Sequence, residues 1–409
     1  MADRPFDVIL YGATGFTGRL VAEYLLDQYG PDGDLRWAMA GRSLEKLESV
    51  RNALQGHKTP TPVPLITADS GDAESLRKLA AQTTVVCSTV GPYARFGSPL
   101  VAACVAEGTH YCDLTGEVPW IAKMIEAHQA EAEESGARIV HCCGFDSIPS
   151  DLGTWFVQQA MMDEHGVHAS RVRGRVGKSR GGVSGGTVAS LMGVLEGASG
   201  NKAEQARLAD KYLLYPAGEA RGPAVKDQKT PVYDPCFARW TSPFVMALIN
   251  ERVVRRSNAL LGFPWSKDFN YDEAQLCGSR AEAVAISMGM GAAMLSAATT
   301  PGRALMGRLL PDPGEGPDRA TRERGFFELF FHAEHPTDRS KSLRARVGGD
   351  RDPGYGATSR MLGEAAVCLA KDDIEVGGGI WTPASALAPV LIPRLEKNAG
   401  MSFELVQDA

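Results

Sequence analysis

The stretch Gly12-Ala13-Thr14-Gly15-Phe16-Thr17-Gly18 decides the fold of this chain. It follows a short apolar run of strand type, Phe6 to Tyr11, and opens a helical pattern from Gly15 to Tyr29. Between a strand and a helix, such spaced glycines permit a tight turn, a close backbone approach to a pyrophosphate and close helix–sheet packing. Free N–H groups and the helix dipole favour phosphate there. We therefore expect residues 12–18 to bind a dinucleotide.

The pattern of strands alternating with helices continues through the first third of the chain. Further strands are expected over Arg36–Ala40, Leu65–Ala68, Thr84–Val90, His110–Leu114 and Ala137–Cys142. Six strands alternating with helices predict an α/β fold, a Rossmann-type doubly wound parallel sheet with both faces covered.

The rhythm of the sequence changes after about Asp151. Arg171–Val176 alternates basic and small residues in the manner of an antiparallel strand with one wet face. Further strands are expected over Phe326–His332 and Leu343–Val347. They predict a second, α+β substrate domain with a mostly antiparallel sheet. We expect the Rossmann domain over 1–158, the substrate domain over 159–354, and a C-terminal segment, 355–409, that returns to the first domain. A helix over Gly356–Ala370 should pack against the Rossmann sheet.

The residues after the second strand indicate which cofactor binds. Dinucleotide sites for NAD place an acid about 20 residues past the glycines, but here the position carries Arg42. A guanidinium can hold a 2′-phosphate with two hydrogen bonds, and Ser43 and Lys46 can add to it. The predicted cofactor is NADP(H). Asp69 could bond the adenine or simply cap the next turn, and the loop Val90-Gly91-Pro92-Tyr93 should flank the nicotinamide.

Composition excludes several other classes of protein. The 409 residues are 44% hydrophobic and 22% charged, with a net charge of −6, which disfavours nucleic acid as a partner. Eight scattered cysteines without C-x-x-C or metal-ligand spacing predict reduced, buried thiols and no metal. No signal segment or spanning run is evident. We expect a cytoplasmic protein, with peripheral membrane association and homo-oligomers left open.

Taken together, these motifs resemble those of the saccharopine-dehydrogenase-like oxidoreductases. The resemblance covers nearly the whole chain, and its C-terminal elements are similar to the branch called trans-acting enoyl reductases. The motifs that carry it are 12–18, 40–42, Val90–Tyr93, Tyr111-Cys-Asp-Leu-Thr-Gly-Glu117, Gly144-Phe-Asp-Ser-Ile-Pro-Ser-Asp151, Ser184-Gly-Gly-Thr187, Asp352-Pro-Gly-Tyr-Gly356 and Gly379-Ile-Trp-Thr-Pro383. The resemblance implies an enzyme that acts beside polyketide synthases in lipid biosynthesis. It transfers no catalytic residue.

Enoyl reduction needs a hydride, stabilisation of an enolate and a proton source. Tyr93, Asp146 and Ser147 should lie at the carboxyl edge of the sheet and are our candidate catalytic residues, with Asp113 and Thr115 in reach. Each could instead shape a loop or cap a helix. The favoured hypothesis is an NADPH-dependent enoyl reductase acting on a long-chain acyl thioester, on a carrier protein or polyketide synthase. The alternatives are an amino- or imino-acid dehydrogenase and a non-catalytic scaffold on membranes or lipid bodies.

Two further segments carry open alternatives. Ala283–Ala298 is apolar and uncharged; a buried helix pair is the favoured interpretation, and an acyl-chain tunnel or a shallow membrane contact is the alternative. Arg171, Arg173 and Arg175 share one strand face by their period-two spacing. This face is either solvated or a landing site for an acidic carrier or a phosphopantetheine phosphate.

Overall fold

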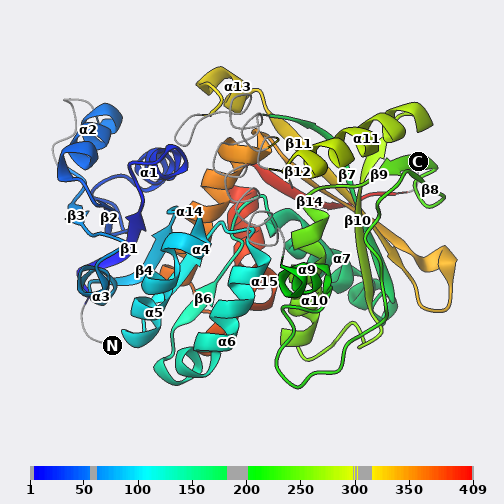
Figure 1. Ribbon diagram of the computed structural model, residues 1–409, viewed down its shortest axis with the longest axis horizontal. Helices are drawn as coiled ribbons and strands as arrows, with labels where there is room; N and C mark the ends of the chain where they lie inside the picture. Colours follow the sequence, from blue (N-terminus) through cyan, green and yellow to red (C-terminus); the bar gives the residue numbers. More distant parts are fainter. Residues whose placement is uncertain are drawn as a thin grey trace.

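The computed structural model describes residues 4–55, 62–181, 201–297, 299, 302 and 316–407. Two seven-stranded sheets lie side by side, and the chain passes from the first to the second near its middle (Figure 1). The motif residues 184–187 lie outside the described residues. Within the described part, no helix combines the length and apolar character needed to cross a bilayer.

The first sheet is parallel, in the order β13-β6-β5-β4-β1-β2-β3. This confirms the predicted Rossmann-type sheet, and all six predicted strands are present. The strands are β1 (Phe6–Tyr11), β2 (Trp37–Gly41), β3 (Leu65–Thr67), β4 (Thr83–Ser88), β5 (His110–Asp113), β6 (Arg138–Val140) and β13 (Gly379–Trp381). The seventh strand, β13, had not been predicted, because it lies outside the run of alternating strands and helices from which the other six were predicted.

Helices cover both faces of this sheet because successive strand residues point to opposite sides. One face packs against α1 (Phe16–Tyr29), α2 (Leu44–Gln55), α14 (Thr358–Lys371) and α15 (Pro383–Asn398). The other packs against α3 (Ala73–Ala81), α5 (Ser98–Ala106) and α6 (Val118–Ser135). The helix expected over 356–370 therefore does pack on the first sheet, where α14 contacts α1, β1, β4 and β5.

The second sheet is mostly antiparallel, as predicted, in the order β14-β12-β11-β7-β10-β9-β8. Among the described pairs, β7 with β10 is the parallel one. The strands are β7 (Arg171–Arg180), β8 (Val232–Asp234), β9 (Arg239–Ser242), β10 (Asn270–Cys277), β11 (Phe326–Glu334), β12 (Leu343–Gly349) and β14 (Met401–Leu405). Helices α7 (Ile148–His165) and α10 (Ala247–Leu260) lie against it.

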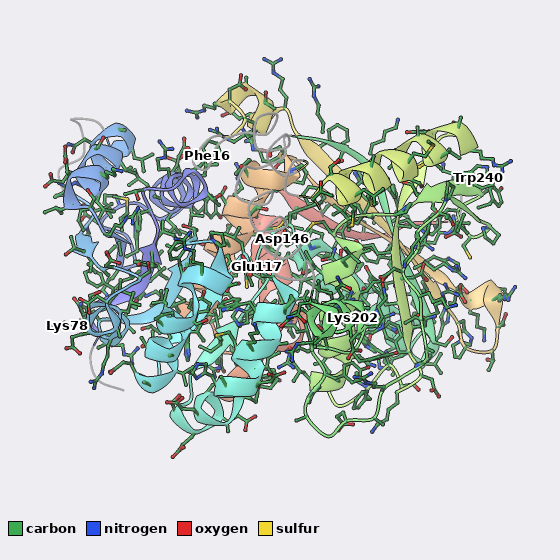
Figure 2. The ribbon with its side chains drawn as sticks, in the orientation of Figure 1. Phe16, Lys78, Glu117, Asp146, Lys202 and Trp240 are labelled. Atoms are coloured by element: carbon green, nitrogen blue, oxygen red, sulfur yellow. The ribbon has the colours of Figure 1, made fainter. Side chains whose placement is uncertain are left out.

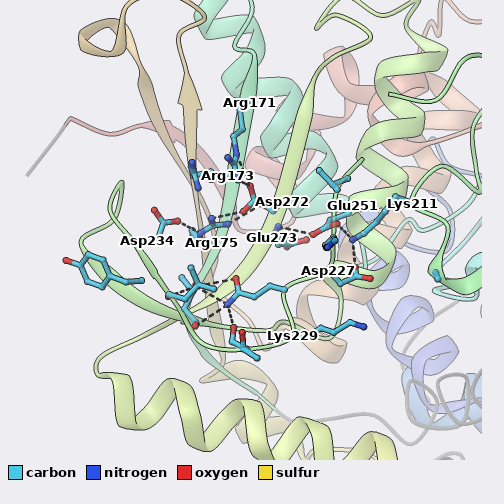
Figure 3. Close-up of a pocket in the computed structure, with 18 residues that line it drawn as sticks. Arg171, Arg173, Arg175, Lys211, Asp227, Lys229, Asp234, Glu251, Asp272 and Glu273 are labelled. Carbon is cyan, nitrogen blue, oxygen red and sulfur yellow. Dashed lines mark hydrogen bonds and ion pairs between the residues drawn. The ribbon is translucent and has the colours of Figure 1, made fainter. Parts of the chain in front are cut away.

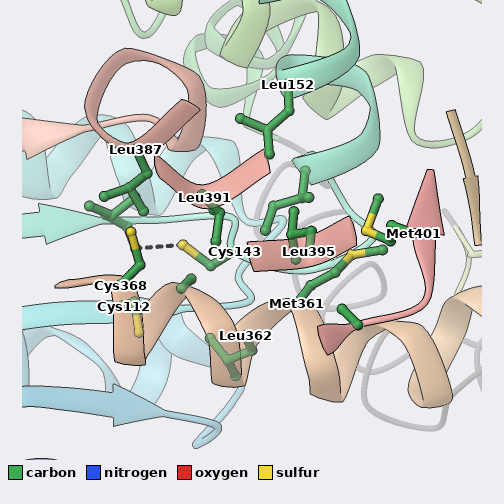
Figure 4. Packing of buried hydrophobic residues seen from close by; sticks show 14 of the residues in the cluster. Cys112, Cys143, Leu152, Met361, Leu362, Cys368, Leu387, Leu391, Leu395 and Met401 are labelled. Carbon is green, nitrogen blue, oxygen red and sulfur yellow. Dashed lines mark hydrogen bonds between the residues drawn. The ribbon is translucent and has the colours of Figure 1, made fainter. Parts of the chain in front are cut away.

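The C-terminal segment joins both sheets instead of returning wholly to the first. β13 extends the Rossmann sheet beside β6, whereas β14 pairs with β12 of the second sheet. The expectation for 355–409 is therefore wrong for residues 401–405, because a single short edge strand carries no sequence signal for its partner. Around α14 and α15, Cys112, Cys143 and Cys368 are buried as free thiols (Figure 4).

The favoured interpretation of the apolar segment 283–298 is also wrong. Residues 283–297 do not form a buried helix pair; they belong to one helix, α11 (Arg280–Ala297), whose buried residues are Ala283 and Ala297 alone. By contrast, the aromatic stretch from Phe263 to Tyr271 contributes Trp265, Phe269 and Tyr271 to the core. Hydropathy alone does not distinguish a core segment from an exposed one.

Candidate active site and cofactor site

The glycine loop has the backbone geometry that a pyrophosphate requires. Gly12 has φ of +94°, and a Cβ there would lie 2.7 Å from Thr89 Oγ1. A Cβ on Gly18 would lie 2.1 Å from the Gly12 carbonyl oxygen, so only glycine lets α1 approach β1 this closely. By contrast, Gly15 is exposed, and its added Cβ would meet little besides the Gly12 oxygen at 3.4 Å. The loop is therefore closely packed at Gly12 and Gly18 and exposed to solvent at Gly15.

The first turn of α1 is suited to binding an anion. Its N-cap, Gly15, provides no side-chain cap, and the turn holds no acidic residue. The N–H groups at a helix start have no partner within the helix, and the helix dipole adds partial positive charge. Thr89 fastens the loop to the end of β4, because its hydroxyl donates to the carbonyls of Tyr11 and Gly12 at 3.3 and 3.2 Å.

The expected 2′-phosphate residues lie at the end of β2. Arg42 and Lys46 are exposed, and no ion pair of theirs occurs in the described part of the chain. The Ser43 hydroxyl accepts a 3.3 Å bond from the Lys46 N–H and so caps α2. Asp69 is exposed, and its Oδ1 accepts a 2.8 Å bond from the Gly71 N–H, which is the turn-capping alternative. Two cations beside a helix start fit the extra phosphate of NADP.

A contact across the chain completes this region. Phe16 of the glycine loop packs edge-on against Tyr355, with ring centroids 4.6 Å apart, and Arg322 lies over the other side of its ring. Tyr355 belongs to a short helical turn, Pro353–Ala357, whose first N–H groups are held by the buried Asp352. The Asp352–Gly356 motif thus supports the cofactor loop, a role that the sequence analysis had missed.

The loop after β4 lies at the same edge of the sheet, but the Tyr93 hydroxyl points inward. It donates to the Ser88 carbonyl at 3.1 Å, and the ring packs on Trp120 at 5.5 Å. Glu117 accepts bonds of 2.8 Å from the N–H groups of Tyr93 and Ala94, which caps α4 (Tyr93–Phe96). Burial raises the pKa of Tyr93 well above its usual value. To donate to a substrate, this hydroxyl would have to leave Ser88.

Ser147 is completely buried at the start of α7. Its hydroxyl donates to Asn250 Oδ1 at 3.0 Å, and the Asn250 amide donates to the Ser150 hydroxyl at 3.1 Å. Ser150 in turn donates to Glu273 at 2.8 Å. Burial raises the pKa of Glu273 to about 7, and its Oε2 atom has no partner. Ser147 is therefore the end of a buried polar chain that reaches into the second domain.

Asp146 is the predicted catalytic residue whose side chain is not bonded to another described residue. It is half-buried, near the middle of the molecule between the two sheets (Figure 2). Its carboxylate lies beside Gly116 and Gly144 and makes no hydrogen bond to another residue among those described. Burial, and then the negative charge of Asp113, raise its pKa to about 7. Near neutral pH this carboxyl can give or take a proton.

Asp113, whose charge acts on Asp146, is paired with His141. The sequence analysis had named Asp113 but had missed His141. Asp113 Oδ2 is 2.7 Å from His141 Nδ1, and the other carboxylate oxygen accepts from the N–H groups of Thr115 and Cys142 at 3.1 and 3.2 Å. His141 Nε2 is buried without a partner, between the rings of Tyr111 and Trp120. The sequence analysis placed His141 inside the strand expected over Ala137–Cys142, whereas β6 ends at Val140 and His141 follows it directly.

The rest of the Gly144–Asp151 motif holds helices together. Asp151 accepts a 2.8 Å bond from the Ala384 N–H in the first turn of α15 and a 2.5 Å bond from the Ser257 hydroxyl of α10. Its carboxylate therefore caps a helix other than its own, and burial raises its pKa to about 6. Through Asp151, this motif joins α7 to α10 and α15.

The three strand arginines share a face, as predicted, and line a cavity of about 630 Å³ in the second domain (Figure 3). Each is paired with acids: Arg171 with Asp272, Arg173 with Glu334, and Arg175 with Asp234 and Asp272. Lys211 in the same cavity pairs with Asp227 and Glu251. These charges largely satisfy one another, so the face presents little free positive charge to a carrier.

Comparison with known proteins agrees with this geometry. Residues 8–140 match the family model described as the saccharopine dehydrogenase NADP binding domain. The chain is 41% identical over 98% of its length, and 97% of the relative's, to a Mycobacterium tuberculosis protein provisionally named a trans-acting enoyl reductase. It is 36% identical to the trans-acting enoyl reductase of Mycobacterium ulcerans, over 97% of both chains. Saccharopine dehydrogenase (L-Glu forming) of Saccharomyces cerevisiae shares the fold, with a TM-score of 0.53 at 14% identity over 98% of this chain and 99% of that one.

Fold, cofactor loop and comparisons define an NADP-dependent oxidoreductase. The chain belongs to the saccharopine-dehydrogenase-like oxidoreductases, in the branch of the trans-acting enoyl reductases.

Proposed function

We propose that this protein is an enoyl reductase that uses NADPH to saturate the double bond of an α,β-unsaturated, long-chain acyl thioester in lipid biosynthesis. The observation that carries the proposal is Asp146, a carboxyl with a pKa of about 7 and no bonded partner in the described chain, at the edge of the sheet where a nicotinamide binds. The names of the relatives support the choice of reaction.

When bound, NADPH would supply the hydride for the β-carbon, and the substrate would then carry the electron pair of its double bond as an enolate on the thioester oxygen. In this proposal the protonated Asp146 carboxyl then gives its proton to the α-carbon and is reprotonated by water. Residues 12–18 with Arg42, Ser43 and Lys46 hold the phosphates, and the Val90–Tyr93 loop bounds the nicotinamide. Tyr93 and Ser147 bind the oxygen only if their hydroxyls exchange their present partners for it.

The proposal is tested by the oxidation of NADPH with enoyl thioesters of increasing chain length. Each methylene buried on the protein adds about 0.8 kcal/mol, so the efficiency should rise with chain length until the apolar surface is filled. Tyr93→Phe should lower kcat more than it changes the Kd of NADPH if the hydroxyl reaches the thioester. A variant with unchanged kcat would leave Tyr93 as a structural residue.

A dehydrogenase of amino or imino acids is the second candidate, because the cavity in Figure 3 holds arginines and carboxylates together. The mutual ion pairs in that cavity argue against it, since they leave few charges free for a zwitterion. Imines of glutamate and lysine are therefore the comparison substrates. Activity confined to them, with none on enoyl thioesters, would replace the first proposal by the second.

A further inference from the structure

Helix α11 is an apolar element that the described protein leaves uncovered. It lies at the outer end of the second sheet and contacts β9 and β10 (Figure 1). Met288 is 71% exposed and Leu295 is 73% exposed. Between Ala283 and Ala297 the helix contains no charged residue. An exposed apolar surface of this kind marks an interaction site.

The exposed surface of α11 extends too far around the helix axis to be covered by packing against one other helix. At 100° per residue, the residues in the exposed class between Val284 and Leu295 cover an arc of about 200°. The apolar stripe by which a helix packs on protein is roughly half as wide. A helix that is uncharged over so much of its circumference is better matched to a lipid medium, which contacts it from all open sides, than to the face of another protein.

The surroundings of α11 are those of a helix in a membrane interface. Arg280, in its first turn, lies 5.4 Å over the ring of Trp240, and Tyr233 packs edge-on against the same Trp240 at 5.7 Å. Tyr233 is 49% exposed, and its neighbour Val232 is 47% exposed. Aromatic and basic side chains at the edge of an apolar surface are typical of contact with lipid headgroups.

The charge around this surface is positive although the whole chain is negative. Within 226–240 and 280–297 the exposed charged residues are Lys226, Lys229, Arg239, Arg280 and Glu282. The segments that contain β8, β9 and α11 therefore carry four exposed cations and one exposed carboxylate, on a chain of net charge −6. Such a surface is complementary to an anionic lipid headgroup layer.

We propose that α11, with β8 and Trp240, is a membrane-docking surface that lies in the headgroup region of an anionic bilayer. The helix lies in the plane of the interface, because no helix in the described part of the chain is able to span a bilayer. The inference rests on exposure and charge and is independent of the reaction proposed above. For an enzyme of long acyl chains, docking here would bring the protein to the phase in which such chains collect.

The test is flotation of the full-length protein with vesicles of phosphatidylcholine containing phosphatidylglycerol, or of phosphatidylcholine alone. The wild type should float with the anionic vesicles and lose this binding as salt is raised. The double variant Met288→Glu with Leu295→Glu should lower the apparent partition coefficient at least about tenfold, because two charges must then enter the interface. The matched control is Leu261→Glu with Leu405→Glu, which adds the same charge at two other exposed apolar residues.

Three outcomes would overturn the proposal. Wild-type protein that stays with the buffer at low salt excludes membrane docking. An equal loss of binding in the control pair would assign the effect to net charge. The third outcome would make α11 an interface between copies of the chain. In that case the wild type does not bind vesicles, and sedimentation velocity shows that the α11 variant has a different oligomeric state from the wild type. Circular dichroism of each variant establishes that it is folded.

Discussion

At the scale of single residues, the site is organised around carboxyl groups with different surroundings. Asp113 is fully buried and receives bonds from His141, Thr115 and Cys142. Asp146, a few residues from His141, has no such partners and feels the charge of Asp113. Two acids placed close together with unequal solvation acquire different proton affinities, which is the usual means of making one of them an acid catalyst.

Asp146→Asn tests that role through both rate and stability. We expect kcat to fall by roughly a hundredfold and the ionisation near pH 7 to disappear from the pH profile of kcat. Because the folded pKa of about 7 lies above the usual 3.8, the native state binds a proton that the unfolded chain has released, and stability falls as pH rises from about 4 to 7. Asparagine removes that loss, so Tm should rise by a few degrees at pH 8 and not at pH 4.

The control for this experiment is Asp268→Asn at an exposed carboxyl, which should change neither property. A pH profile of Asp146→Asn that keeps its ionisation near pH 7 would move the proton donor elsewhere. His141, with its partnerless Nε2, would be the next candidate.

We predict that Arg42 decides the choice between NADPH and NADH. Arg42→Asp should weaken NADPH binding roughly a hundredfold, because it removes a charge-assisted pair and adds repulsion of the 2′-phosphate, while NADH binding should hold or improve. Fluorescence titration with both nucleotides measures the change. Lys78→Asp, a reversal of equal charge on the exposed face of α3, serves as the control. Equal affinity of the wild type for the two cofactors would contradict the prediction.

At the scale of elements, the motifs of this chain mostly build supports for the site. Asp352 shapes the turn that brings Tyr355 to Phe16, Asp151 caps α15, and Glu117 caps the helix after β4. Asp151 and Glu117 act on helices that are remote in the sequence or follow another strand, whereas Asp352 caps the turn that it begins. A helix start can be recognised from its own sequence, but a cap supplied from elsewhere cannot.

The fit between α1 and its loop is tested by Gly18→Ala. The added Cβ would lie 2.1 Å from the Gly12 carbonyl oxygen, so the helix must move away from the loop. We expect NADPH affinity to fall at least about tenfold and Tm to fall with it, although alanine is the better helix former. Gly289→Ala on α11 is the matched control, because nothing lies within 4 Å of its added Cβ and the same substitution should stabilise that helix. Equal effects of the two substitutions would refute the steric argument.

At the scale of the whole molecule, α10 connects the two sheets through buried arginines. Arg256 donates one hydrogen bond to the carbonyl oxygen of Leu214. It donates a second one, of 2.6 Å, to the carbonyl oxygen of Ile380 in β13. Arg255 donates to the Tyr271 carbonyl in β10 at 2.7 Å. Burial lowers the pKa of Arg256 to about 10, which leaves it charged near neutral pH. These arginines of α10 lie in the interior of the protein.

Arg256→Ala should separate the unfolding of the two sheets. The substitution leaves two buried carbonyls without a donor and opens a cavity, at a cost of about 2–4 kcal/mol. Differential scanning calorimetry should show a broadened or split transition, with the part containing β13 melting first. Lys202→Ala, at an exposed lysine, should leave the profile unchanged. A single transition shifted as a whole would show that other contacts couple the sheets.

The sequence by itself determined the first sheet, the dinucleotide loop and the type of cofactor. These depend on local signals: strand and helix periods, glycines at fixed spacing, and a cation in place of an acid at Arg42. It also placed Asp146 at the right edge, because carboxyl ends of parallel strands share one edge.

Tertiary structure alone decided which of those side chains are free to act. Tyr93 and Ser147 turn inward to Ser88 and Asn250, whereas Asp146 faces the space between the sheets. The exposure of α11 and the burial of Arg256 were likewise left undetermined by the sequence, and for residues 283–298 the favoured interpretation had been burial. The physical reason is that a proton affinity or a burial is set by neighbours far along the chain, which a local pattern does not contain.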